Sequence, residues 1–330
     1  MKRQLEVRDE YWKSKVPFRI SGHEWTGFDM VVCELKDDGK VGRGEASGVF
    51  YLDETAESME AQIAQVVARV EAGADRDTLR QLLPPGGARN AIDCALWDLE
   101  AQRQGQSVWT LAGVKPDPVT TVFTIGLEET PEAMAAKAAA ARDRPLLKIK
   151  LNDDRPVERI RAIRAARPDA RLVADCNGGW TFAQLVQWAP EMRQLGLSLL
   201  EQPIARGQDD ELLGYEAPLP LFADESCLHL GELEHAVGRY AGIVIKLDKT
   251  GGLTEALMLA HAAKRRGLRL MVGCMVATSL SMAPSHVLAQ LCEFVDIDGP
   301  LLLERDRPGG LRYDGASVTA PARGFWGTPG

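Results

Sequence analysis

The chain has 330 residues, of which 45% are hydrophobic and 26% charged, and its formal net charge at pH 7 is −8. This composition is typical of a folded globular protein and excludes an intrinsically disordered chain. The negative charge disfavours nucleic acid as a partner, and no apolar run approaches membrane-spanning length, so we expect no membrane association. At roughly 100 to 200 residues per domain, the length accommodates two domains or one large barrel with an addition.

The first part of the chain predicts strands followed by helices. Strand-like patterns occupy residues 5–12 and 28–35, and the segment 41–48 completes a hairpin after a turn. Apolar residues at helical spacing follow in residues 53–71 and 88–104. We expect these segments to form a small α+β unit.

From about Val119 onward, short apolar runs alternate with helical patterns, which is typical of βαβ units and a parallel sheet. Eight candidate strands recur about every 25 residues, close to what a TIM-type barrel requires. The candidates are residues 121–127, 146–151, 171–177, 197–203, 221–226, 242–248, 268–274 and 294–300. No phosphate-binding glycine fingerprint follows the first strand, which favours a barrel over an open sheet.

We therefore predict an α/β fold, namely a modified TIM barrel of the (β/α)7β type with an N-terminal α+β capping domain. Residues 1–118 would form the capping domain and residues 119–305 the catalytic barrel. Residues 306–330 are rich in turn-forming residues, and we expect them to pack back on the capping domain.

Charged side chains stand where most of the candidate strands end. They are Lys148, Lys150, Asp175, Glu201, Asp224, Lys246, Asp296 and Asp298. Because residues two apart share a strand face, an inward face would gather the whole set at the carboxyl end of one barrel. Any one of them is equally well explained by a solvated ion pair. The set is not, because carboxylates on consecutive strands repel one another unless a cation lies between them.

Asp175, Glu201 and Asp224 offer hard oxygen ligands without histidine or cysteine, which favours Mg²⁺ over zinc, with Mn²⁺ as a substitute. Lys150 and Lys246 would flank this site from opposite sides of the barrel mouth. A lysine acts as a base only with a lowered pKa, and we expect partial burial and the nearby charge of Lys148 to lower it.

Five motifs together resemble those of the enolase superfamily, in its muconate-lactonising-enzyme-like branch. They are KIK at 148–150, DCN at 175–177, EQP at 201–203, ADES at 223–226 and IKLDKTGG at 245–252. DIDGP at 296–300 narrows the resemblance to the dipeptide epimerases, and in particular to the bacterial Ala-Glu epimerases. The segment RNAIDCALWDL at 89–99 extends the resemblance over nearly the whole chain.

The resemblance implies a role for each of the matching residues. Asp175, Glu201 and Asp224 would bind one Mg²⁺ per subunit, and Lys150 and Lys246 would form the acid/base pair. Enolase-superfamily sites with a lysine or histidine base and magnesium are a known pattern.

The resemblance also implies a set of substrate-binding residues. Lys148 would contact the substrate carboxylate, and Thr124 would contact the peptide. Asp296 and Asp298 would hold the α-ammonium group of a dipeptide.

The implied protein is an isomerase, a magnesium-dependent dipeptide epimerase. It would transfer a proton at the α-carbon of the C-terminal residue of an L-Ala-D/L-Xaa dipeptide, through an enediolate intermediate. The dipeptide would be Ala-Glu or a less acidic relative of it. One alternative is an o-succinylbenzoate synthase or muconate cycloisomerase of the same superfamily, against which only Asp296 and Asp298 argue. Another is a non-catalytic barrel that binds a ligand, which the intact set of charges disfavours.

The cellular setting is predicted more coarsely. The six cysteines are scattered without a CxxC pair, which indicates reduced thiols in a cytoplasmic protein. The expected partner is a small-molecule dipeptide. The role of the relatives implies murein-peptide metabolism. A homo-oligomer is compatible with the sequence.

The resemblance also implies a mobile loop at residues 20–28, which bears on specificity. Relatives that act on glutamyl dipeptides usually present an arginine or other basic residue there, whereas this chain has His23 and Trp25, and a gapless match puts Trp25 near the place of that arginine. Packing of Trp25 on the capping domain alone explains an aromatic residue there equally well. We therefore expect apolar or small side chains to compete well with glutamate. Arg19 or His23 would restore a preference for acid if either reached the pocket.

Overall fold

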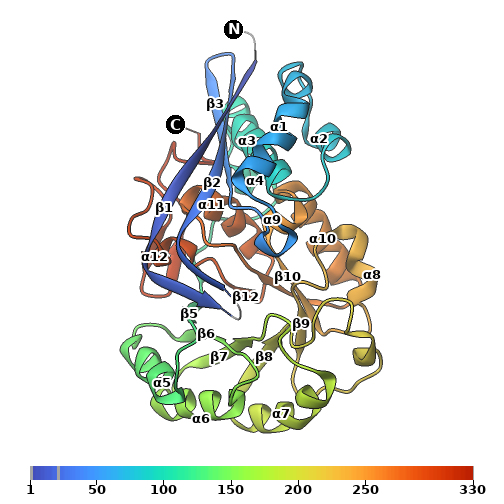
Figure 1. The fold of residues 1–330 in the computed structure, drawn as a ribbon. Coiled ribbons are helices and arrows are strands. Elements are labelled where there is room, and N and C mark those ends of the chain that lie inside the picture. The colour runs from blue at the N-terminus through green and yellow to red at the C-terminus, as the bar shows by residue number, and fades with distance from the viewer. Residues whose placement is uncertain (1–2, 21–22, 330) are drawn as a thin grey trace.

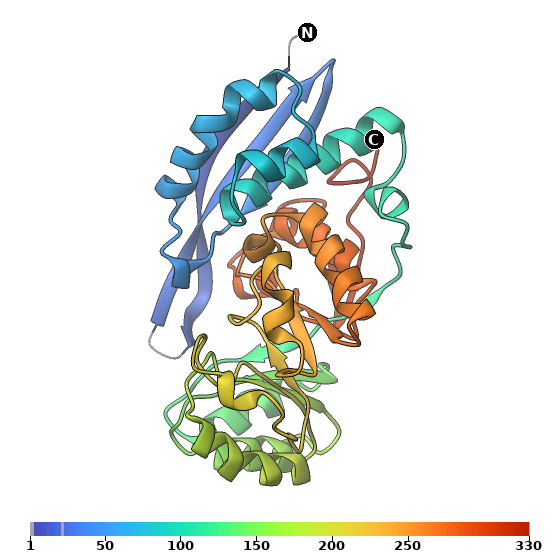
Figure 2. The same cartoon turned by 90° about the vertical axis from the view of Figure 1, so that its right-hand side faces the viewer.

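The computed structural model describes residues 3–20 and 23–329, and for residues 19 and 20 it describes the backbone alone. The chain forms a capping unit of antiparallel strands and helices beside a barrel of parallel strands (Figure 1 and Figure 2). The predicted fold class is confirmed. Within the described ranges, no helix is both long enough and apolar enough to cross a membrane.

The capping unit is built on a three-stranded antiparallel sheet in the order β1-β2-β3. Its strands are β1 (Gln4–Ile20), β2 (His23–Asp37) and β3 (Lys40–Ala46). The prediction of a loop at residues 20–28 is wrong for residue 20, which ends β1, and for residues 23–28, which belong to β2, where Trp25 pairs with Phe18 of β1. The sequence hid this extension because both faces of the hairpin end are partly exposed and no alternation of apolar residues marks it. Residues 21 and 22 lie outside the described residues.

Helices cover one face of this sheet (Figure 2). They are α1 (Ala56–Glu71), α2 (Arg76–Leu82) and α3 (Gly87–Gln104), with η1 (Phe50–Leu52) before them and α4 (Val108–Leu111) after. Helix α3 lies very close to β3. A Cβ atom added at Gly42 would lie only 2.1 Å from the carbonyl oxygen of Ala95. Glycine in this strand is therefore what lets backbone meet backbone.

We expect Gly42→Ala to lower the free energy of unfolding by about 1 to 3 kcal/mol, because the added methyl group overlaps backbone atoms of α3. Denaturant unfolding of the purified protein measures this. Lys40→Ala, on the exposed end of the same strand, is the matched control and should change stability by less than about 0.5 kcal/mol. Equal stability of the two variants would contradict the close approach of α3 to β3.

All eight predicted barrel strands are present, and each pairs with its neighbour in sequence. They are β5 (Phe123–Ile125), β6 (Leu146–Lys150), β7 (Arg171–Asp175), β8 (Leu197–Glu201), β9 (Leu221–Ala223), β10 (Gly242–Ile245), β11 (Arg269–Val272) and β12 (Phe294–Val295). The backbone N–H of Val122 donates to the carbonyl oxygen of Val295 at 2.8 Å and so joins the two ends of the sheet.

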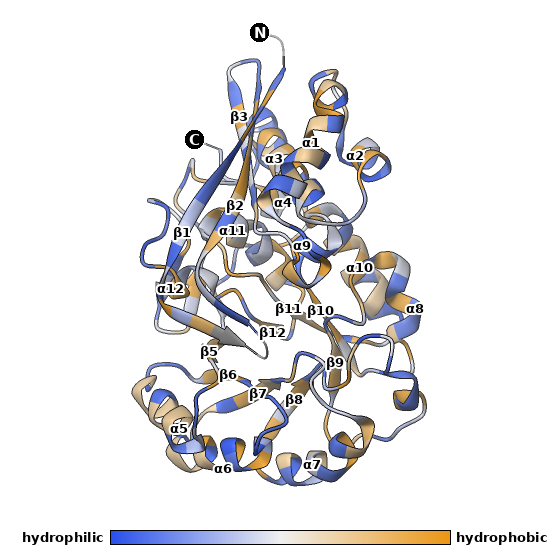
Figure 3. Ribbon diagram, viewed as in Figure 1, coloured by the Kyte–Doolittle hydropathy of each residue, from blue (hydrophilic) through white to orange (hydrophobic). Residues whose placement is uncertain are grey.

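Helices and short helical turns connect these strands. They are α5 (Pro131–Ala140), α6 (Pro156–Ala166), α7 (Phe182–Gln194), η2 (Asp210–Leu212), η3 (Leu230–Glu232), α8 (Leu233–Ala236), α9 (Leu247–Thr250), α10 (Leu253–Arg265), α11 (Ser279–Ala289) and α12 (Gly299–Leu302). In Figure 3 the strands β8, β9 and β10 are mainly hydrophobic, whereas α6 and α7 carry both colours, as expected for helices that cover a barrel.

The C-terminal segment contacts the capping unit. Strands β13 (Arg312–Asp314) and β14 (Ser317–Thr319) form a small sheet with β4 (Val119–Thr120). Further on, the indole Nε1 of Trp326 donates to the carbonyl oxygen of Arg43 at 2.9 Å, and the N–H of Gly327 donates to Asp98 Oδ1 at 2.8 Å. These bonds connect the end of the chain to β3 and α3.

Side chains alternate between the inside and the outside of the barrel. One apolar residue from each strand or from its approach fills the interior: Val122, Leu146, Val173, Leu199, Phe222, Val244, Met271 and Phe294. Because residues two apart share a strand face, the second residue after each of these also points inward, nearer the carboxyl end.

Candidate active site

The alternation places nine of the predicted site residues at the carboxyl end of the barrel. Each stands two or four positions after an apolar interior residue: Thr124, Lys148, Lys150, Asp175, Glu201, Asp224, Lys246, Asp296 and Asp298. All but Thr124 are buried, the three central carboxylates completely. On β11 the corresponding position is Gly273, which leaves space beside Lys246.

Three carboxylates occupy neighbouring strand ends. Asp175 ends β7, Glu201 ends β8 and lies in register with it, and Asp224 follows β9. A lysine stands on each side of this row. Lys150 Nζ on β6 lies 2.7 Å from Asp175 Oδ2, and Lys246 Nζ after β10 lies 2.6 Å from Asp224 Oδ2.

Lys148 lies among the carboxylates rather than at their edge. Its Nζ is 3.2 Å from Asp175 Oδ2, 2.8 Å from Glu201 Oε2 and 2.8 Å from Asp296 Oδ2. One ammonium group is therefore shared by three buried anions from different strands.

Positive charge is unevenly distributed over this row. Burial alone would raise the pKa of Asp175 and Asp224, but the adjacent lysines outweigh it and hold both pKa values below the usual range. Glu201, between them, has a raised pKa, because burial and the charge of Asp175 outweigh the attraction of Lys148. The ammonium group of Lys148, which Glu201 shares with Asp175 and Asp296, therefore does not offset the burial of Glu201.

This donor set fits a hard divalent cation. Three buried carboxylates without a nitrogen or sulfur donor suit Mg²⁺, and a cation among them would supply the charge that Glu201 lacks. Cys176, between Asp175 and Asn177, packs in the hydrophobic core. Burial raises the pKa of its thiol well above the usual value, so it stays protonated.

The expected lowering of the lysine pKa is wrong for Lys246. Burial and the charge of Lys148 lower this pKa, but the charges of Asp224 and of the neighbouring glutamates together outweigh them and raise it above the ordinary value. The pKa of Lys148 is likewise raised, because Asp296, Glu201 and Asp175 outweigh burial. The strand pattern indicates the neighbouring Lys148, whereas the 2.6 Å contact between Lys246 and Asp224 follows only from the folded structure.

Two residues that were not predicted from the sequence, Lys249 and Gln202, support the site. Lys249 is buried, and its Nζ donates to both the side chain and the carbonyl oxygen of Asp224, each at 2.6 Å. The amide oxygen of Gln202 accepts the backbone N–H groups of Asp224 and Ser226, and so ties the end of β8 to the end of β9. The available signal was their place in the sequence, since Lys249 lies in IKLDKTGG and Gln202 in EQP, next to predicted site residues.

Asp296 and Asp298 form a second acidic group after β12. Asp296 accepts from Lys148, whereas Asp298 Oδ2 accepts the backbone N–H of Thr124 at 2.8 Å. Burial and the charge of Asp296 raise the pKa of Asp298, so this pair also lacks positive charge. Cys274 Sγ joins them within 4.8 Å, but burial keeps this thiol protonated by raising its pKa, which disfavours a metal. An ammonium group suits the pair better.

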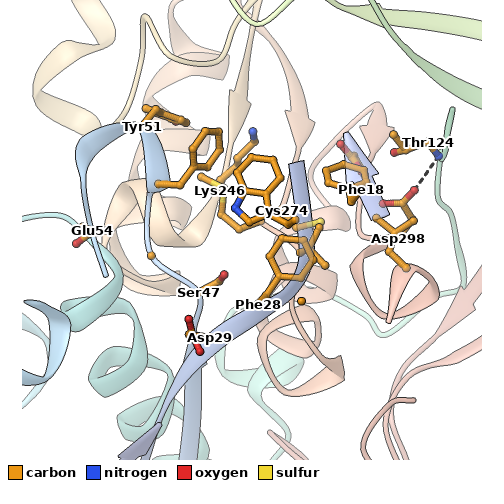
Figure 4. A pocket seen from close by; sticks show the side chains of 18 of the residues that line it. Phe18, Phe28, Asp29, Ser47, Tyr51, Glu54, Thr124, Lys246, Cys274 and Asp298 are labelled. Carbon is orange, nitrogen blue, oxygen red and sulfur yellow. Dashed lines mark hydrogen bonds between the residues drawn. The ribbon is translucent and has the colours of Figure 1, made fainter. Parts of the chain in front are cut away.

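A cavity lies between these groups and the capping hairpin. Its barrel side includes Lys148, Lys150, Lys246, Asp296 and Asp298, and its capping side carries Phe18, Trp25, Phe28, Phe50 and Tyr51. In Figure 4 the rings of Phe18 and Phe28 share this space with Lys246, Cys274 and Asp298.

The two residues predicted to govern specificity have different places. Trp25 lines the cavity, whereas His23 stacks on Trp25 with ring centroids 5.2 Å apart and does not line it. The side chain of Arg19, the other candidate partner for an acid, lies outside the described residues.

Two family models match the chain. One, described as "Mandelate racemase / muconate lactonizing enzyme, N-terminal domain", matches residues 2–113, and the other, described as "Enolase C-terminal domain-like", matches residues 133–325. The sequence is 41% identical over 314 residues to the L-Ala-D/L-Glu epimerase of Escherichia coli (strain K12), covering 94% of this chain and 98% of that protein. It is 35% identical over 306 residues to the N-acetyl-D-glutamate racemase of a Pseudoalteromonas species, covering 90% and 95%.

Solved structures give the same relationship. An enolase family member from Agrobacterium tumefaciens, described as homologous to dipeptide epimerases and holding sodium and L-Ala-L-Glu with an ordered loop, has a TM-score of 0.94. Its sequence is 43% identical, and the match covers 98% of this chain and 99% of that one. Other dipeptide epimerases of this fold were solved in complex with Mg and a dipeptide.

Proposed function

The chain belongs to the mandelate racemase and muconate lactonizing enzyme family of the enolase superfamily, and we propose that it is a magnesium-dependent dipeptide epimerase. The observation that carries the proposal is the order of charges around the barrel. Lysines on β6 and β10 flank the carboxylates of β7, β8 and β9, and the pair Asp296 and Asp298 lies beyond them. Two of the relatives are named for, or were solved with, a glutamyl dipeptide, so glutamate belongs in the test of the C-terminal residue.

Asp175, Glu201 and Asp224 would hold the magnesium ion. When bound, the ion would draw negative charge from the substrate carboxylate and make the neighbouring α-hydrogen more acidic. Lys148 would donate to the same substrate carboxylate, and its place among three acidic side chains keeps it protonated for that role.

Lys150 and Lys246 would each serve one face of the α-carbon. Their strands, β6 and β10, are separated by the three carboxylate-bearing strands, so the two ammonium groups approach the space above the carboxylates from opposite sides. One lysine would take the α-proton, and the other would return a proton from the opposite face. The product is the epimer, and the reverse reaction exchanges the two roles.

The direct test is α-proton exchange. Incubating the enzyme with a library of L-Ala-L-Xaa dipeptides in deuterium oxide and following mass by spectrometry should reveal incorporation of one deuteron with at least one dipeptide. Absence of exchange with every dipeptide, in the presence of magnesium, would contradict the proposed function.

Asp296 and Asp298 would bind the free α-ammonium group, with Thr124 holding Asp298 in place through its backbone N–H. We expect N-acetylation of the best dipeptide to reduce kcat/KM about a hundredfold or more, because the acetylated nitrogen leaves buried carboxylates without a cation. Steady-state kinetics with the free and acetylated dipeptides measure the ratio. Asp298→Asn should reduce this ratio, whereas Asp314→Asn, at an exposed position, should leave it unchanged.

The same measurement separates the alternatives. Equal turnover of N-acylated and free substrates would favour an N-acylamino acid racemase, as the name of the Pseudoalteromonas relative suggests. Turnover of neither would move the protein toward the o-succinylbenzoate synthase or muconate cycloisomerase reactions of the superfamily.

We also propose that the protein acts in the cytoplasm. All six cysteines lie in the described part of the chain, and all are free thiols, four of them buried. Free thiols are typical of a reducing compartment.

A further inference from the structure

We propose that the cavity selects dipeptides whose C-terminal residue carries a large uncharged side chain, aromatic or branched aliphatic, in preference to one that carries a carboxylate. This inference rests on the proposed function, because it names the substrate class of the same site. It comes from the side chains that the capping unit presents to the cavity.

Four aromatic rings form one wall of the cavity, and we call this set, Phe18, Trp25, Phe28 and Phe50, the aromatic wall. Trp25 is its centre. The ring centroid of Trp25 lies 5.0 Å from that of Phe50, 6.0 Å from that of Phe28 and 6.3 Å from that of Phe18. The ring of Trp25 is also stacked against the ring of His23.

These contacts give the wall a fixed apolar surface. Each of the four rings is half-buried, so each keeps surface that an apolar side chain of the substrate can cover. The rings already pack against one another, and little conformational freedom is lost when a ligand binds. A preformed wall of this kind favours large apolar groups over small ones.

The charges around the wall disfavour an acidic side chain. Among the described residues that line the capping side of the cavity, none is an arginine or lysine, and two, Asp29 and Glu54, are acids. The cations on the barrel side, Lys148, Lys150 and Lys246, each lie within 3 Å of a carboxylate of the barrel. A glutamate side chain that entered the cavity would therefore lose its hydration and lie next to aromatic rings and acidic side chains, which disfavours its negative charge.

A cationic side chain is disfavoured as well. Both carboxylate oxygens of Glu54 accept backbone N–H groups, from Val49 and Gly87, and burial raises the pKa of Glu54. Asp29 is exposed and stays hydrated. The acids of the capping side therefore repel a carboxylate without offering a strong partner to a buried ammonium group.

The test compares kcat/KM for L-Ala-L-Phe, L-Ala-L-Leu, L-Ala-L-Glu and L-Ala-L-Lys with the wild-type enzyme and magnesium. We expect the better of Phe and Leu to exceed both Glu and Lys at least tenfold. A smaller advantage, or a preference for Glu or Lys, would overturn the inference while leaving the epimerase proposal intact. Failure of the epimerase proposal has a different signature, the absence of α-proton exchange with all four dipeptides.

Variants at Trp25 test the cause of the preference. Trp25→Arg removes the centre of the wall and adds a cation, so the ratio of Phe to Glu turnover should fall at least tenfold. Trp25→Phe keeps an aromatic ring and should preserve the preference for Phe over Glu. Circular dichroism shows whether Trp25→Arg folds, and if it does not, Trp25→Phe is the variant in which the ratio is measured. An unchanged ratio in a folded Trp25→Arg enzyme would overturn the role of the wall.

Arg19 requires a variant of its own, because its side chain lies outside the described residues. Arg19→Ala should leave the ratio of Phe to Glu turnover within about threefold of the wild-type value. A larger rise in that ratio would show that Arg19 supports glutamate in the cavity and would overturn the inference.

Discussion

Lys150→Ala and Lys246→Ala should each reduce epimerisation, measured as kcat/KM, at least about a thousandfold, because a positioned acid or base contributes about 10² to 10⁴ in rate and inversion requires one on each face. The strands β6 and β10 place the two ammonium groups on opposite sides of the carboxylate row. Neither lysine can therefore replace the other. Chiral chromatography of the product, or polarimetry, measures the loss directly.

The two variants should remain folded. After removal of Lys150, Asp175 still has Lys148 Nζ at 3.2 Å, and after removal of Lys246, Asp224 still has Lys249 Nζ at 2.6 Å. Neither change therefore leaves a buried carboxylate without a cation, which is the costly outcome when an ion pair is broken. Unchanged circular dichroism separates loss of chemistry from loss of fold.

Half of the reaction should survive in each variant. The remaining lysine can remove a proton and return one on its own face, so each single variant should exchange the α-proton of one epimer with deuterium oxide without inverting it. The two variants should prefer opposite epimers. Lys137→Ala, which removes an exposed lysine paired with Glu128, is the control and should epimerise normally. Near wild-type epimerisation by either active-site variant would contradict the two-base mechanism.

Much of this arrangement could be predicted from the sequence because buried strands have a strict period of two. Leu146, Lys148 and Lys150 share one face, so once Leu146 faces the barrel interior, both lysines must do so as well. The same rule predicts that Asp296 and Asp298 point inward, because Phe294 on the same face points into the barrel interior. Charged residues at such positions have no structural role in an apolar interior, and this is why they were recognisable as a site.

Features that depend on contacts between distant segments could not be predicted in this way. The aromatic wall combines residues of β1, β2 and η1, and no periodic pattern in the sequence relates Phe18 to Phe50. The pKa of Lys246 depends on a carboxylate 22 residues away, whose distance follows only from the barrel geometry. The role of Gln202 is of the same kind, since its partners lie on the next strand.

Exhaustive treatment with EDTA should abolish turnover, and added MgCl2 should restore it, because the row of Asp175, Glu201 and Asp224 requires a cation. A second measurement does not depend on activity. At a magnesium concentration 100 times its Kd, binding to the folded state alone should stabilise the protein by about 2.7 kcal/mol, which thermal unfolding detects as a raised Tm.

Glu201→Gln connects this stabilisation to the proposed ligands. Glu201 has a raised pKa because burial and the charge of Asp175 disfavour its anion, so a neutral amide should be tolerated in the metal-free fold. The same change removes a ligand, and magnesium should then raise the Tm of Glu201→Gln much less than that of the wild type. Glu211→Gln, at an exposed position, should respond to magnesium as the wild type does. Full turnover after chelation with no metal detected by elemental analysis, or an equal magnesium response in Glu201→Gln, would contradict a metal at this row.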